Sequence, residues 1–135
     1  MSKSAIYTAN TSIQSIAVDG IISPGTIIRR YGPNINLSGN AIQIDGAGYY
    51  DIDASITVAP TAIGSVTVTA YENGVPIQGA SATASTSTAN NPVNISITSL
   101  VREFCNCCEG ISNLTFVLSG TAANVSNVSI VVTKL

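Results

Sequence analysis

Apolar and polar residues alternate with a period of two along residues 50–58, YDIDASITV. The apolar positions are Tyr50, Ile52, Ala54, Ile56 and Val58, and the polar positions are Asp51, Asp53, Ser55 and Thr57. Successive side chains of a strand point to opposite faces of its sheet. The pattern therefore predicts a strand with one face on a core and the other in water.

A hairpin follows this strand. Residues 66–71 alternate in the same way, and the chain then reaches Asn73 and Gly74. An Asn-Gly pair supplies the two positive-φ residues of a type I′ turn. Because Pro76 has no N–H to donate, the return strand is predicted to be short or to lie at a sheet edge.

Strand patterns recur at residues 93–98, 114–118 and 128–133, and no stretch shows a convincing helical period. The small polar residues 81–92 predict a loop or a weak strand. Together these signals indicate about eight to ten short strands in one domain, with turns roughly every 8–12 residues. We therefore predict an all-β fold, an antiparallel jelly-roll sandwich.

The composition narrows the range of functions. Charged residues make up 9% of the 135-residue chain, and a surface so poor in charge favours self-association. Five basic residues and a net charge of −2 offer no basic patch for nucleic acid. No apolar run is long enough to span a membrane, and the N-terminal residues lack the apolar core of a signal peptide. We expect synthesis in a host cytoplasm.

The chain has no histidine, and it has no phosphate-binding glycine loop. The absence of histidine removes the Ser-His and Cys-His nucleophiles and imidazole acid–base catalysis. We expect a protein that is not an enzyme and that uses no cofactor.

The three cysteines, Cys105, Cys107 and Cys108, lie within four positions of one another. Packing thiols are the favoured interpretation, because one CxC without histidine cannot close a tetrahedral zinc site. A metal or intersubunit site and a disulfide remain open. Asp51 and Asp53 share a strand face and form a second candidate site, for a hard cation such as calcium.

The segment GYYDIDASITV, residues 48–58, resembles the Gly-x-Tyr-x-apolar strand of the tumour-necrosis-factor and complement-globular-head jelly rolls. Gly48, Tyr50 and Ile52 occupy the motif positions. The resemblance implies a jelly roll of ten strands that assembles as a tight trimer, with the terminal strands near the threefold axis. The chain is most similar to free-standing phage and bacterial members, which include trimeric capsid decoration proteins.

The last strand is apolar on both faces, which indicates that both are covered. Val131 and Leu135 face away from Ile130 and Val132, and they are the predicted trimer-interface residues. The other interpretation, scattered surface apolar residues, stays open.

The resemblance implies a trimeric phage capsid decoration protein at the virion surface, bound to the major capsid protein or to another virion surface. Residues 1–16 are predicted to be an anchoring segment or first strand, and residues 17–135 a single jelly-roll domain. One alternative is a receptor- or glycan-binding tip that uses exposed tyrosines such as Tyr31 and Tyr71. A second alternative is a spore or cell-surface layer component.

Overall fold

The computed structural model describes residues 3–103 and 111–135, and every regular element within them is a β-strand. The described strands are β1 (Ala5–Asn10), β2 (Gln14–Ile16), β3 (Thr26–Tyr31), β4 (Ile35–Ser38), β5 (Ala41–Asp45), β6 (Gly48–Pro60), β7 (Gly64–Glu72), β8 (Val75–Thr86), β9 (Val93–Glu103), β10 (Ile111–Ser119) and β11 (Ala123–Lys134). The described part of the chain contains no helix that could cross a membrane.

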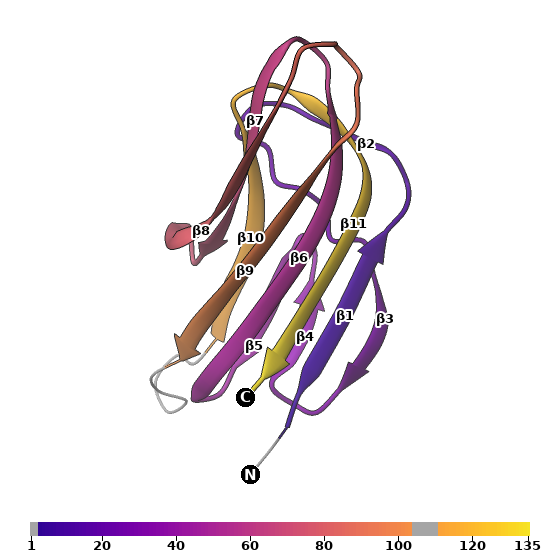
Figure 1. Ribbon diagram of the computed structural model, residues 1–135. Helices are drawn as coiled ribbons and strands as arrows, with labels where there is room; N and C mark the ends of the chain where they lie inside the picture. Colours follow the sequence, from indigo (N-terminus) through magenta and orange to yellow (C-terminus); the bar gives the residue numbers. More distant parts are fainter. Residues whose placement is uncertain (1–2, 104–110) are drawn as a thin grey trace.

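The strands form two antiparallel sheets that pack face to face (Figure 1). Sheet A has the order β3-β1-β11-β6-β9, with β2 paired to the first residues of β11. Sheet B has the order β4-β5-β10-β7-β8. Neighbouring strands in both sheets are mostly far apart in sequence, which is the connectivity of a jelly roll. The predicted all-β antiparallel jelly roll is confirmed.

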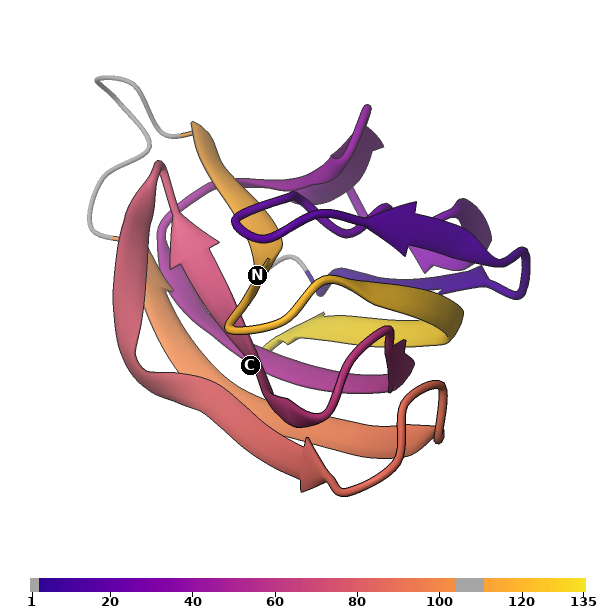
Figure 2. The same cartoon turned by 90° about the horizontal axis from the view of Figure 1, so that it is seen from above.

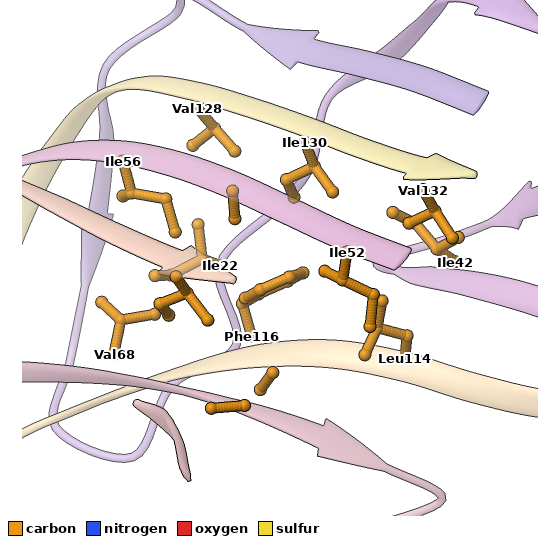
Figure 3. Close-up of a cluster of buried hydrophobic side chains, with 14 of the residues drawn as sticks. Ile22, Ile42, Ile52, Ile56, Val68, Leu114, Phe116, Val128, Ile130 and Val132 are labelled. Carbon is orange, nitrogen blue, oxygen red and sulfur yellow. The ribbon is translucent and has the colours of Figure 1, made fainter. Parts of the chain in front are cut away.

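The core lies between the sheets and consists of the inward members of each alternating strand (Figure 3). Phe116 of β10 lies in the middle, with Ile52 and Ile130 of sheet A facing it. Tyr50 and Ile52 are fully buried, and the Tyr50 hydroxyl donates a hydrogen bond to the Gly46 carbonyl at 2.9 Å. The tyrosine of the GYY segment thus fills the core and also holds the β5–β6 turn.

The chain reverses between β7 and β8 at Asn73 and Gly74, whose φ angles are 52° and 80°. Both angles lie in the left-handed region that a type I′ turn requires. The return strand β8 lies at the edge of sheet B, as Pro76 predicted. Residues 81–86, predicted to be a loop or weak strand, belong to β8 and pair with β7.

The two N-terminal strands, β1 and β2, are part of sheet A. Strand β1 pairs with β11 on one side and with β3 on the other, and β2 extends the same sheet. Both termini lie at one end of the molecule, and the loops that follow β1, β6, β8 and β10 lie at the other (Figure 1). We call the latter the loop end. Seen from above, the strands of both sheets are curved around the core (Figure 2).

Candidate functional site: the outer face of sheet A

Sheet A turns one face to the core and the other outward, and we call the outward side the sheet A face. The register aligns its side chains in rows that cross β1, β11, β6 and β9. The rows are Ala5–Thr133–Asp51–Leu100, Tyr7–Val131–Asp53–Thr98 and Ala9–Ser129–Ser55–Ser96. The face is therefore a continuous surface of four strands.

The half of this face near the termini carries apolar and aromatic side chains beside Asp51 and Asp53. Val131 is half-buried between Tyr7 and Asp53, and Leu100 is 56% exposed on β9. Leu135 is 70% exposed, and its backbone N–H donates to the Tyr49 carbonyl at 2.9 Å. Both predicted interface residues thus lie on or beside one surface. The sequence did not show that Tyr7, Tyr49 and Leu100 join them, because sheet order brings these strands together.

The other half of the face is lined by small hydroxyl side chains. Ser55, Ser96 and Ser129 lie side by side across three strands. They contribute to a hollow of about 280 Å³, which is lined by Asp53, Ala54, Ser55, Ser96, Ile97, Thr98, Ser129 and Val131. Ala54 and Ile97 point into the core, so their main-chain atoms form the floor. Such a hollow can receive side chains of a second protein surface.

Charged side chains of both signs lie on the sheet A face. Asp51 and Asp53 lie in the first half of β6, while Arg29 lies opposite Tyr7 on the outer strand β3. Arg102 on β9 lies over the Tyr49 ring, 5.5 Å from its centroid. Strands β1 and β11 separate Arg29 at the β3 edge from the two aspartates on β6.

The two aspartates predicted as a cation site lie on the same face, where Asp51 is half-buried and Asp53 is exposed. Their register neighbours are Thr133, Leu100, Val131 and Thr98, none of which is acidic. Among the described residues, no three acidic, cysteine or histidine side chains gather closely enough to hold a metal. Cys105, Cys107 and Cys108 lie outside the described residues, so their role stays a prediction.

A buried carboxyl, Glu103, lies between the sheets at the end of the termini, and the half-buried Glu72 and the exposed Asp45 are close enough to affect its pKa. Glu103 is 8% exposed and accepts a hydrogen bond from the Ser112 hydroxyl. Burial, a hydrogen bond to Glu72 and the charges of Glu72 and Asp45 raise the Glu103 pKa to about 7, against the opposing hydrogen bond from Ser112. The pKa of Tyr50 is raised too, first by burial and then by Glu103 and Asp45. Sequence reasoning missed this cluster, because its carboxyls come from β5, β7 and β9.

The two tyrosines that were expected to be exposed differ in solvent exposure. Tyr31 is 57% exposed on β3, whereas Tyr71 is half-buried on β7. Tyr49, which was not singled out, is 46% exposed. The tyrosines at positions 7, 31 and 49 all project from sheet A on its outer side, by their register.

No protein-family model and no curated protein sequence matches the chain. Solved structures do match. Murine APRIL at pH 5.0 superposes with a TM-score of 0.73 at 11% identity, covering 98% of this chain and 99% of that one. Eiger TNF from S. frugiperda gives a TM-score of 0.69 at 10% identity, with coverage of 98% and 91%. The PRD1 vertex protein P5 gives 0.63 at 16% identity, with coverage of 98% and 96%.

At these identities the likeness establishes the fold. It extends over nearly the whole chain and includes a tumour-necrosis-factor structure together with the PRD1 vertex protein P5. The predicted tumour-necrosis-factor-like jelly roll is therefore confirmed. A shared fold does not determine function, which depends on the residues at the surface.

Proposed function

We propose that the protein is a non-enzymatic structural protein of a virion, which forms a homotrimer and decorates a phage capsid from outside. The observation that carries this proposal is the sheet A face. It combines half-buried Val131, exposed Leu100 and Leu135 and a row of small hydroxyls. The apolar residues of this face and the aromatic rings of Tyr7 and Tyr49 are of the kinds found in the covered core of an interface between subunits.

The distribution of charge favours a cyclic, head-to-tail arrangement over a twofold dimer. In a ring, one region of each copy contacts a different region of the next copy. The Arg29 edge of one subunit would then meet Asp51 and Asp53 on the neighbouring face. A twofold contact through β6 would bring the aspartates of both copies together, which like charges oppose. Three copies close such a ring in this proposal.

The loop end offers a surface for the capsid. Its loops, residues 11–13, 61–63, 87–92 and 120–122, contain no charged residue. Ile13 and Ile63 project there with 74% and 70% of their surface exposed. Apolar side chains that protrude from an uncharged surface suit docking on another protein. In this proposal residues 1–16 anchor the protein through Ile13, since β1 and β2 themselves pair within sheet A.

The fold likeness to the PRD1 vertex protein P5 supports a place in a virion. Bracing would work by binding alone: each trimer would contact neighbouring capsomers and add buried surface between them. The alternatives of a receptor-binding tip and of a spore or cell-surface layer use the same trimer with a different partner.

Mass spectrometry of particles purified from the source culture tests the proposal. We expect peptides of this chain in the capsid band, at a stoichiometry fixed relative to the major capsid protein. We also expect mild denaturant to release the protein and leave shells that rupture at a lower temperature. Recovery of the chain only in tail fibres, spores or cell envelopes would overturn the decoration role.

A further inference from the structure

A polar hollow of about 140 Å³ opens at one edge of the sandwich, where β3 of sheet A lies beside β4 of sheet B. It is lined by Arg30, Pro33, Asn34, Asn36, Gln43 and Asp45. No group in the hollow has a part in the proposed trimer face or in the loop end. It is therefore a separate feature of the molecule.

Hydrogen bonds hold the walls of the hollow in place. The Arg30 Nε donates to the Ile35 carbonyl at 2.6 Å. Asn34 accepts a bond from the Ser4 hydroxyl at 3.0 Å and donates from Nδ2 to the Asp45 carbonyl at 2.7 Å. Polar groups fixed in this way lose little freedom when a ligand arrives, which is a condition for binding a small molecule.

Several polar groups of the hollow remain unused. Asn36 and Gln43 lie directly opposite each other in the β4–β5 pair. Asn36 Oδ1 accepts from the Leu37 backbone N–H at 2.9 Å, and its Nδ2 has no partner in the described part of the chain. The Gln43 amide and the Asp45 carboxylate make no side-chain hydrogen bond to other described residues. The terminal guanidinium nitrogens of Arg30 likewise make no hydrogen bond to other described residues.

The chemistry of these groups selects a class of ligand. The carboxylate only accepts hydrogen bonds, the guanidinium only donates them, and an amide does both. Neighbouring sugar hydroxyls each need a donor and an acceptor. An anion would meet the Asp45 carboxylate and a cation the Arg30 guanidinium, so the pair disfavours charged ligands of either sign. We propose that this hollow binds a neutral sugar residue, such as the terminal hexose of a glycan.

The surface beside the hollow continues the same pattern. Asn113 of β10 lies opposite Gln43 on the outer face of sheet B. Tyr71 of β7 lies opposite Thr115, two residues along β10 on that face. Tyr71 is thus a diagonal neighbour of Asn113, and such neighbours are roughly 7–8 Å apart, within reach of an aromatic side chain. The Tyr71 ring can therefore offer an apolar surface to a second sugar of the same chain.

The test is an NMR titration of the ¹⁵N-labelled full chain. The probes are galactose, glucose, mannose and N-acetylglucosamine, with glycerol as the simple polyol and glucuronic acid as the acidic sugar. We expect at least one neutral sugar to shift the amide signals of residues 34–45. A single sugar ring has few atoms to contact, so the expected Kd is on the order of 1–10 mM. Glycerol and glucuronic acid should bind at least tenfold more weakly.

The matched variants are Gln43→Ala in the hollow and Gln78→Ala on the exposed surface of β8. Gln43→Ala should weaken sugar binding by roughly fivefold, the effect of losing one hydrogen-bonding partner, and Gln78→Ala should leave it unchanged. The proposal is overturned if no neutral sugar shifts these signals, if shifts map elsewhere, if glucuronic acid alone binds, or if both variants bind equally. Light scattering on the same samples reports the trimer separately, so the two proposals can fail independently.

Discussion

At the scale of single residues, Glu103 makes the molecule sensitive to pH. Its pKa is about 7 in the folded state, against an ordinary value of 4.5. Between these values the folded protein binds more protons than the unfolded chain. The free energy of unfolding therefore falls as pH rises through this window. The contribution of protonated Glu103 to stability is fully present only below pH 4.5 and is lost as pH rises past about 7.

Replacing Glu103 with glutamine should remove this dependence. The new amide can still accept from Ser112 and donate to Glu72, but it carries no charge to bury. We expect the variant to gain on the order of 1–3 kcal/mol at pH 8 and nothing at pH 4.5, measured by urea unfolding at fixed protein concentration. Asp19→Asn is the control, since Asp19 lies in an exposed loop with a positive φ that asparagine tolerates. A pH profile unchanged by Glu103→Gln would contradict this role.

Thr8 is a second residue with a clear energetic consequence. It is fully buried on β1, and among the described residues its hydroxyl has no hydrogen-bond partner. A buried hydroxyl left unpaired is destabilising by about 1–3 kcal/mol. Thr8→Val should therefore raise the free energy of unfolding by about 1 kcal/mol, which thermal and urea unfolding can measure. A loss of stability would show that the hydroxyl has a partner.

Some of these residue environments could be predicted from the sequence and others could not. The alternation that marks Tyr50 and Ile52 as inward is local, so their burial is readable from the chain. The Glu103 cluster is not, because Glu72 and Asp45 reach it from other strands. A single glutamate in an alternating strand gives no sign that two further carboxyls face it.

At the scale of elements, substitutions at two glycines separate the cost of backbone strain from the cost of a steric clash. Gly74 in the β7–β8 turn and Gly25 before β3 both have a positive φ, of 80° and 89°. A Cβ at Gly74 would meet no atom within 4 Å, whereas a Cβ at Gly25 would lie 2.2 Å from the Ala9 carbonyl oxygen. Gly74→Ala therefore strains only the backbone, while Gly25→Ala also displaces β1.

We expect Gly74→Ala to lower the free energy of unfolding by about 1 kcal/mol, the cost of an alanine in this conformation. Gly25→Ala should lower it by at least about 2 kcal/mol more, or prevent folding. Urea unfolding of both variants in parallel makes the comparison. Equal losses would mean that the β2–β3 loop does not rest against β1 as the structure places it.

Elements with strong alternation were predictable, and elements held by tertiary contacts were not. Residues 81–86 are small and polar, so their sequence signals a loop, yet pairing with β7 keeps them extended. Strand β2 has only three residues and forms because β11 offers an edge beside it. The hollow at Arg30 could not be predicted either, since it requires β3 and β4 to meet across the two sheets.

At the scale of the whole molecule, the sheet A face should control assembly. Val131→Lys places a cation opposite Asp53, where it can pair within one subunit and leave the fold intact. The same charge would be buried between subunits in the proposed trimer, which is unfavourable. We expect a folded monomer in sedimentation and a native-like circular dichroism spectrum. Val75→Lys on the exposed turn of sheet B is the matched control and should stay trimeric.

The most direct test of the account is the mass of the purified wild-type protein in solution, measured by light scattering with and without reductant and chelator. The account predicts about 41 kDa, three times the 13.8 kDa chain, unchanged by either reagent. A mass that falls with chelator or reductant would make the cysteine segment the assembly site. A monomer of 13.8 kDa under all conditions would contradict the trimer, and the decoration role built on it.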